Sequence, residues 1–410
     1  MNAISRTSVL KASLYLWMVV IPFSAALSNV FLVICCLLVT INLRYQTPKE
    51  AKTLLKYPAF ILFFLFAFSI VVSEDNQQGF YELKHNIPLI LSAFVVFFSI
   101  QIIPSGIIKS LIILIIATFI AFIFSSFFNL LPFETARNIH EVFGTKLKPF
   151  EESNRDLFGW YIPFMVRIQF GNLMSFLAIV AAVMAIIEKK PFWWISSILL
   201  TVMVFIIGVR GSMLGLMFAG FILLIYVLKE KISISISAKL MIGLMILLIP
   251  VIFYAYGKIN ARWQQTKFEI ESVQNGTFEQ YEYEHYSILT RWNSWKNGIQ
   301  LWQQHPFTGT GIGDYKKEYQ LTYQDDTIKV PLYYHSQWFY FLGVFGIVGL
   351  LIFIVTYILW WFKFRFHKTM FLYGSMLSLY LAIIWIFDAG MLSQIDIISF
   401  GFFTTLIQCF

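Results

Sequence analysis

The sequence contains few charged residues. Lys, Arg, Asp and Glu together make up 13% of the 410 residues, whereas 59% are hydrophobic and 19% are aromatic, and the mean hydropathy is +0.73. A soluble protein of this length needs about a quarter charged residues to cover its surface. The composition therefore predicts a polytopic membrane protein. In such a protein, the net charge of +8 is evidence about membrane topology in the first place and about nucleic-acid binding only in the second.

Cysteine pairs and nucleotide-binding motifs are also missing. Cys35, Cys36 and Cys409 all lie in apolar stretches and form no CxxC pair, which argues against a disulfide framework or a cysteine zinc site. The segment "GTGIGD" at 309–314 matches neither a Walker motif nor GxGxxG, so it predicts a tight backbone turn rather than a nucleotide site. A GxSxG elbow, which would indicate a hydrolase, is absent from the sequence as well.

Apolar runs that are long enough to cross a membrane recur along the chain. A spanning helix needs about 20 mostly apolar residues. We predict twelve helices, at 12–26, 27–43, 57–73, 86–103, 106–132, 168–187, 191–208, 211–228, 238–256, 337–362, 369–387 and 391–409. Residues 12–43 allow a single long helix broken at Pro22 as the alternative to the first pair. The fold class is an all-α polytopic membrane protein, with residues 1–410 forming one integral membrane domain.

The basic loops orient these helices. Short loops such as "EKKP" and "KFRFHK" hold positive charge on the cytoplasmic side if both termini are cytoplasmic. Two long segments, 133–167 and 257–336, then lie outside. The second one falls between predicted helices nine and ten and is rich in Trp, Tyr, Gln and charge. Loops of this length are uncommon without a function, so we expect the chemistry there.

Arg210 stands between two apolar runs in "FIIGVRGSMLGLM". An arginine near the membrane is costly and usually faces a polar cavity or partner, which makes it a candidate functional residue. The alternative is an interfacial arginine that reaches to water and only anchors a helix. Gly211 and Ser212 would place backbone N–H groups at the start of the next helix, and such a terminus suits phosphate.

The segment 287–319 predicts an amphipathic helix that is followed by the glycine-rich turn. Trp292, Trp295, Ile299 and Trp302 share one face of this helix, a pattern more typical of packing or membrane-interface burial than of a binding site. Arg291 begins the helix. Its charge is either solvated in the loop or directed at a ligand.

His335 comes directly before the apolar run "SQWFYFLGVFGIVGLLIF". A helix N-terminus disfavours the imidazolium, so a histidine here stays neutral and could act as general base toward a hydroxyl. The alternative is an interfacial or hydrogen-bonded residue without a catalytic role. Gly343, Gly346 and Gly349 predict the close approach of a neighbouring helix.

Two acidic clusters offer side chains of the kind that bind metal ions. "YEYEH" offers Glu282, Glu284 and His285, and "QDD" offers Asp325 and Asp326. Neither cluster lies at a predicted membrane boundary, and charges in a large wet loop are usually solvated. We therefore predict no metal site and no cofactor.

Three motifs together resemble one family. They are "VRGSMLGL" at 209–216, "RWNSWKNGIQLWQQHPFTGTGIGDY" at 291–315 and "HSQWFYFLGVFGIVGLLIF" at 335–353. In their order and placement they resemble the O-antigen ligase and polymerase superfamily, bacterial membrane proteins that transfer lipid-linked glycans. Ser336 stands where this family usually has Asn. The ligase-like core is expected over 168–362.

The resemblance implies a GT-C-like, metal-independent, inverting glycosyltransferase. Its donor would be a glycan on undecaprenyl pyrophosphate, with the pyrophosphate bound by Arg210 and Arg291. His335 would take the proton of the acceptor hydroxyl. The implied location is the bacterial inner membrane, with the active site on the periplasmic side.

The acceptor stays open between several possibilities. The leading function is an O-antigen ligase that uses a lipid A–core sugar, and a polymerase or a protein O-oligosaccharyltransferase shares the same donor chemistry. A transporter of lipid-linked sugars is a further alternative. It predicts internal repeats and charged or broken helices at mid-membrane, and the sequence shows neither.

Overall fold

The structure is a computed structural model that describes residues 3–44, 54–130, 166–230, 264, 267–272, 274–275, 287–322, 335–390 and 393–409. Every regular element in these ranges is a helix. Seven of them are long and apolar enough to cross a membrane: α2 (Ala25–Leu43), α5 (Asn76–Ile102), α6 (Pro104–Leu130), α9 (Arg167–Glu188), α11 (Arg210–Lys229), α15 (Gln337–Phe362) and α16 (Lys368–Phe387). The predicted all-α polytopic membrane protein is confirmed.

Eleven of the twelve predicted spans coincide with a helix in the described ranges. Besides the seven, these are α1 (Ala3–Val20), α4 (Pro58–Ser69), α10 (Pro191–Ile207) and α17 (Gln394–Thr405). The predicted span at 238–256 lies outside the described residues. With 12 residues each, α4 and α17 are shorter than the roughly 20 residues that a straight span needs. The count of twelve is therefore not established.

The first two predicted helices are separate in the structure. α1 ends at Val20, and Ser24 caps α2, where its side chain accepts a hydrogen bond from the N–H of Leu27 at 3.3 Å. The indole N–H of Trp17 donates to Ser28 Oγ at 3.0 Å and so joins the two helices across the turn. The single broken helix over 12–43 is excluded.

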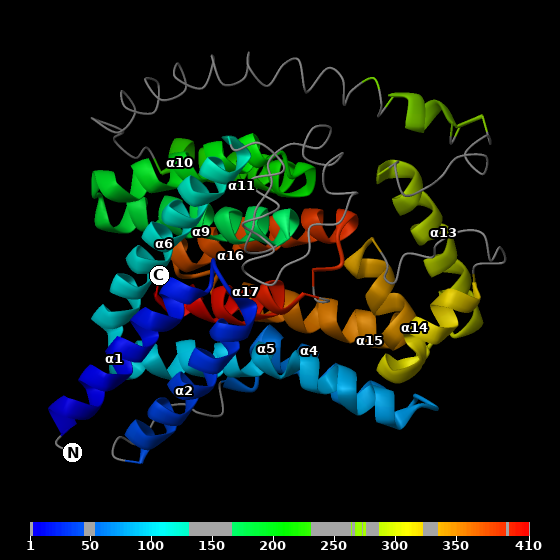
Figure 1. Ribbon diagram of the computed structural model, residues 1–410, viewed down its shortest axis with the longest axis horizontal. Coiled ribbons are helices and arrows are strands. Elements are labelled where there is room, and N and C mark those ends of the chain that lie inside the picture. The colour runs from blue at the N-terminus through cyan, green and yellow to red at the C-terminus, as the bar shows by residue number, and fades with distance from the viewer. Residues whose placement is uncertain are drawn as a thin grey trace.

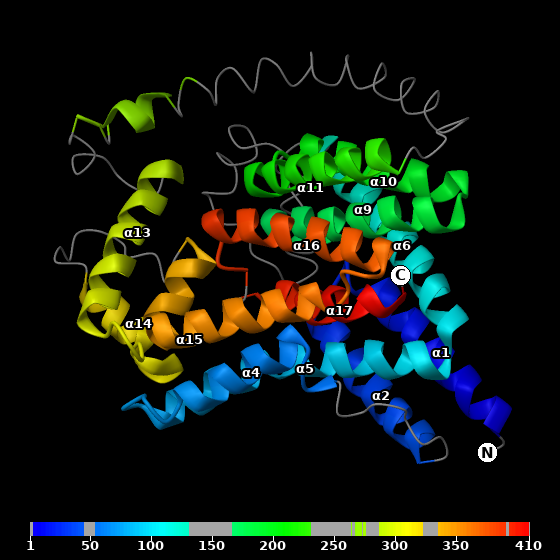
Figure 2. The same ribbon diagram turned by 180° about the vertical axis from the view of Figure 1, so that it is seen from behind.

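α9 forms the centre of one part of the bundle. Its sequence is almost entirely apolar and rich in Ala, and every residue from Phe170 to Ala185 is buried. A helix that is hydrophobic all round must be enclosed by other helices, and α10, α11, α16 and α17 all contact α9. Figures 1 and 2 show α9, α10, α11 and α16 running side by side.

α15 is bent at Gly346, which has a φ of 63°. The bend removes the helical acceptors of the next two N–H groups. Ile347 and Val348 instead donate to the carbonyl oxygens of Pro306 and Phe307, at 2.9 and 3.3 Å. A side chain at position 346 would collide with Phe307 and Gly309, and a positive φ also favours glycine.

This bend corrects two expectations. The element that approaches the glycines of α15 is the turn between α13 (Ser287–Gln304) and α14 (Gly311–Leu321), not a neighbouring helix. His335 therefore precedes a short first part of α15, before the bend, rather than a straight spanning helix.

The turn predicted at 309–314 ends earlier than predicted, because residues 311–314 form the first turn of α14. Gly309 and Gly311 have φ values of 68° and 79°. The turn is held against the connection between α4 and α5, because Asp314 accepts hydrogen bonds from the N–H groups of Glu74 and Asp75. The loop predicted over 257–336 thus includes α13 and α14, which are attached to the membrane-spanning part.

Candidate active site

Arg210 is the first residue of α11 and is half-buried. α10 ends just before it at Gly208, which is in the left-handed conformation with a φ of 72°. The short connection is pressed against α9, since a Cβ at Gly171 would come within 2.8 Å of Val209 Cγ2. This packing positions the start of α11 close to the start of α9, where Arg167 interacts electrostatically with Arg210.

Arg291 lies in α13 and faces the end of α16. Its Nε–H donates to the carbonyl oxygen of Phe387 at 3.0 Å, which fixes the plane of the guanidinium. The pKa of Arg291 is lowered, chiefly by burial; the carboxylate of Asp388 opposes this change and the charge of Arg210 adds to it. Arg291 is therefore close to the carboxylates of Asp388 and Glu269 and to the first predicted arginine.

The chain at His335 is clamped between α13 and the end of α16. The N–H of His335 donates to Ser294 Oγ at 3.0 Å, and its carbonyl accepts from the indole of Trp295 at 3.4 Å. Ser336 Oγ donates to the carbonyl of Trp385 at 2.9 Å. Ser336, which departs from the usual residue of the resembled family, thus ties the histidine to α16.

The pKa of His335 is lowered to about 4, first by burial and then by the charge of Arg291. The ring is neutral at pH 7, as the sequence predicts. Burial and the nearby guanidinium of Arg291 both lower the pKa, in the same direction as the helix terminus considered from the sequence.

The structure brings the three predicted residues together. Arg210 and Arg291 act on each other electrostatically, and so do Arg291 and His335, although they come from α11, α13 and the segment before α15. Two guanidinium groups beside a neutral imidazole can bind an anion and accept a proton at the same place.

Sequence analysis missed Asp388. This residue follows α16 and is half-buried, and the pKa of its carboxyl is raised to about 6 by burial, an effect that the charge of Arg291 and the N–H of Ala389 partly offset. Its backbone carbonyl accepts from the N–H of Gln337 at 3.2 Å. The available signal was an acidic residue directly after a predicted span, on the same side as Arg210.

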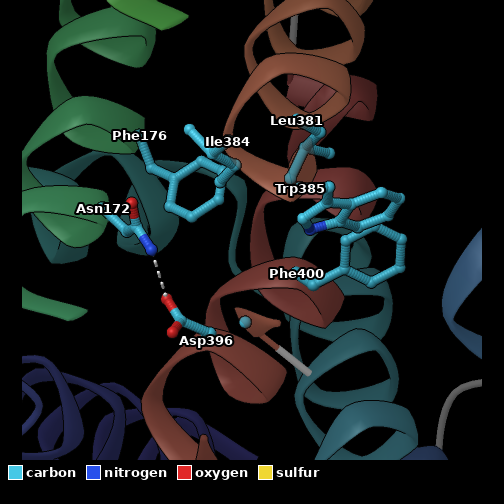
Figure 3. A pocket seen from close by; sticks show the side chains of 8 residues that line it. Asn172, Phe176, Leu381, Ile384, Trp385, Asp396 and Phe400 are labelled. Atoms are coloured by element: carbon cyan, nitrogen blue, oxygen red, sulfur yellow. Dashed lines mark hydrogen bonds between the residues drawn. The ribbon is translucent and has the colours of Figure 1, made fainter. Parts of the chain in front are cut away.

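A buried polar network joins α9 to three neighbouring helices. Asn172 of α9 accepts hydrogen bonds from Ser212 Oγ at 2.7 Å and from Tyr380 OH at 3.1 Å. It also donates to Asp396 Oδ1 at 3.2 Å (Figure 3). Asn172 therefore connects α9 to α11, α16 and α17. Such interhelical bonds hold helices in register inside a membrane.

A small cavity adjoins this network. It has a volume of about 10 Å³, close to that of one water molecule, and is lined by Asn172, Asp396 and six neighbours that include Trp385 and Phe400. Asp396 Oδ2 is buried and has no hydrogen-bond partner among the described residues. Asp396 lies in the first turn of α17, near one end of the last predicted span, and α15 is bent at Gly346, a break that the sequence did not predict.

The residues of the two acidic clusters, Glu282, Glu284, His285, Asp325 and Asp326, lie outside the described residues. Within the described ranges, no three His, Cys, Asp or Glu side chains are grouped so that they could hold a metal ion.

Comparison with known protein families gives one match. Residues 195–354 match the family described as O-antigen ligase. The match includes Arg210, Arg291 and His335, and it covers α11, α13, α14 and most of α15. No curated protein matches the chain.

Proposed function

We propose that this chain, a member of the O-antigen ligase superfamily, transfers a glycan from a polyprenyl pyrophosphate to the hydroxyl of an acceptor. One observation carries the proposal: Arg291 lies close to both Arg210 and His335, which come from two other segments, and hydrogen bonds to Phe387 and Ser294 hold Arg291 and His335 in place. Paired arginines suit a pyrophosphate, and a neutral imidazole suits an acceptor hydroxyl. This pairing of roles favours glycosyl transfer over transport.

The two arginines bind the donor. Guanidinium groups bind phosphate oxygens bidentately, and the bond from Arg291 to Phe387 holds its guanidinium in one plane for that purpose. As the bond between the anomeric carbon and the pyrophosphate oxygen breaks, its electron pair goes to the leaving pyrophosphate. Arginines that already face this oxygen stabilise the developing charge, so the scheme requires no metal.

His335 takes the proton of the acceptor hydroxyl while the new carbon–oxygen bond forms. In the empty site the charge of Arg291 keeps the imidazole a weak base. A bound pyrophosphate adds negative charge near Arg291 and raises the pKa of His335, which makes the imidazole a stronger base only when the donor is present. Attack in line with the leaving group inverts the anomeric configuration, and a product with retained configuration would contradict this mechanism.

The donor is proposed to be undecaprenyl pyrophosphate carrying an O-antigen glycan, and the acceptor a lipid A–core sugar at the periplasmic face of the inner membrane. A polymerase, which extends the lipid-linked repeat, and a protein O-oligosaccharyltransferase use the same donor chemistry with other acceptors. The site residues named above are compatible with each of these acceptors, so the experiment must identify the product.

The test replaces His335 with Ala in the native host and follows both the surface polysaccharide and the lipid-linked pool by gel electrophoresis. His305→Ala is the matched control, because His305 is an exposed histidine of the turn after α13, away from the arginines. Loss of a ligase leaves long chains on the polyprenyl carrier and none on lipid A. Loss of a polymerase leaves a single repeat attached, and normal surface glycan in His335→Ala would refute the catalytic role.

A further inference from the structure

α13 has one side that packs on the protein and one that does not. The packed positions recur at intervals of three and four: Ser294, Asn297, Gly298 and Leu301 are buried. On the opposite side Trp292 and Ile299 are 45% and 41% exposed. They are seven residues apart and so project from the same side of the helix. A large aromatic and a branched aliphatic side chain are thus uncovered on this helix.

The uncovered side of α13 consists of an apolar strip and a polar strip, and both run along the helix axis. At 100° per residue, the half-buried Trp295 and Trp302 lie next to Trp292 and Ile299, and we call these four residues the apolar flank. Lys296, Gln300 and Gln304 lie on the other flank, which is polar. The indole N–H groups of Trp295 and Trp302 donate to the carbonyls of His335 and Pro306, at 3.4 and 3.1 Å. Their rings can therefore border hydrocarbon without an unsatisfied donor.

The apolar flank adjoins a membrane-spanning helix. Beyond α13, Phe307 is 68% exposed, and its carbonyl accepts the N–H of Val348 in α15. Val348 and Ile352 are themselves 49% and 45% exposed, in a helix apolar enough to span the bilayer. Exposed apolar side chains thus occur on α13, on the turn that follows it and on the part of α15 to which this turn is hydrogen-bonded.

The direction of α13 agrees with this arrangement. In Figures 1 and 2, α13 runs across the direction shared by α9, α10, α11 and α16, beyond one end of these helices. An amphipathic helix that crosses the direction of these spanning helices at the end of the bundle is placed to lie along the membrane surface. Amphipathic helices that rest in the headgroup region have such a split between an apolar and a polar side, and Trp is enriched at that depth.

We infer that the apolar flank of α13 is embedded in the lipid of the outer leaflet. The occupant of this surface is the bilayer itself, because the flank adjoins the lipid-facing residues of α15, and its polar flank then faces water. Arg291 lies four residues before Trp295, at the edge of the apolar flank. The lipid contact of α13 therefore sets Arg291 at the depth of lipid phosphates, where a lipid-linked pyrophosphate would reach it.

The test measures which medium surrounds each flank, independently of any transferase activity. Cys35, Cys36 and Cys409 are replaced, single cysteines are placed at Trp292, Ile299 and Gln304, and each is labelled with a nitroxide in liposomes of neutral and anionic phospholipids. Gln304 is the matched control, since it is exposed and belongs to the polar flank of the same helix. Collision with oxygen, which concentrates in hydrocarbon, is compared with collision with a water-soluble nickel complex.

Labels at 292 and 299 are expected to collide more with oxygen than with nickel, and the label at 304 more with nickel. If nickel reaches 292 and 299 as readily as 304, the flank faces water and the inference is wrong. If the labels at 292 and 299 are immobile and neither reagent reaches them, another protein segment or a second copy of the chain covers the flank, which also overturns it. A lack of transferase activity would leave these outcomes unchanged.

Discussion

His335 and Asp388 show how burial and one arginine set the charge state of the site. Burial lowers the pKa of His335 to about 4 and raises the pKa of Asp388 to about 6, since burial favours the neutral form of each group. Arg291 lowers both pKa values, so it strengthens the effect on His335 and weakens the effect on Asp388. The site at pH 7 therefore combines a neutral imidazole with a largely ionised carboxylate.

The pH dependence of transfer follows from these pKa values. A base with a lowered pKa keeps its neutral form down to lower pH, so kcat/KM for the donor is expected to rise as the pH increases through about 4 and then to stay level with respect to His335. An additional inflection near pH 6 would belong to Asp388. The measurement is kcat/KM in detergent from about pH 4 to about pH 8.

The same pH profile of kcat/KM is measured for Asp388→Asn, because this variant removes the second titrating group and keeps the shape of the side chain. The inflection near pH 6 is expected to disappear in this variant, and the one near pH 4 to remain. An inflection at the ordinary histidine pKa of 6.5 that persists in Asp388→Asn would show that His335 is not buried beside Arg291 in the working enzyme.

At the scale of helices, the network around Asn172 aligns the elements that carry the site. Ser212 belongs to the first turn of α11 together with Arg210, and Asn172 lies in α9, two turns or less from Arg167. Tyr380 and Asp396 extend the network into α16 and α17, on either side of Asp388. The position of Arg210 thus depends on buried hydrogen bonds between helices.

Ser212→Ala is expected to raise KM for the donor by about fivefold and to leave KM for the acceptor unchanged. One interhelical hydrogen bond contributes about 1 kcal/mol, which corresponds to about that factor if all of it is spent on the position of Arg210. The measurement is steady-state transfer with each substrate varied in turn. A structural defect alone would lower the amount of folded protein without this separation of the two KM values.

Ser110→Ala provides the control for Ser212→Ala. Ser110 is also a fully buried serine in a spanning helix, but its hydroxyl donates to Gly106 O at 2.8 Å within its own helix α6. Its kinetics are expected to match those of the unaltered protein. If both variants shift the donor KM equally, the network around Asn172 has no particular role in positioning Arg210.

Sequence patterns predicted the elements that are defined by hydrophobicity. The span predicted at 168–187 is α9 almost residue for residue, because an uninterrupted apolar run leaves little choice of boundary. The bend at Gly346 was missed, since it depends on carbonyls of Pro306 and Phe307 that are distant in sequence. Asn172 was missed for the same reason, because its importance comes from residues on other helices. Asp388 had a local signal, its position directly after a predicted span, but its partner Arg291 is distant in sequence.

At the scale of the whole molecule, the two ends of the bundle differ in character. One end carries Arg210, Arg291 and His335. The other carries the short basic loops, where Lys368 at the start of α16 forms a 2.7 Å ion pair with Glu230 at the end of α11. Short basic loops are retained in the cytoplasm, so the site end is expected to face outward.

This orientation can be measured with two exposed positions. A membrane-impermeant maleimide is expected to label Lys317→Cys, in α14, in intact spheroplasts, and to label Arg365→Cys, between α15 and α16, only after permeabilisation. Both variants replace an exposed basic residue in a background without the native cysteines. Labelling of Arg365→Cys in intact spheroplasts would place the site in the cytoplasm and contradict a periplasmic donor.

The hydrogen bonds between residues 306–307 and 347–348 also determine when the site can form during protein synthesis. Chains are synthesised from the N-terminus, so α13 and its turn leave the ribosome before the N–H groups of Ile347 and Val348 exist. The carbonyl of Phe387, which accepts the hydrogen bond from Arg291, is likewise synthesised almost a hundred residues later. The arginines and the histidine therefore come together only after α16 has been inserted, and an incomplete chain cannot carry a working site during its own biosynthesis.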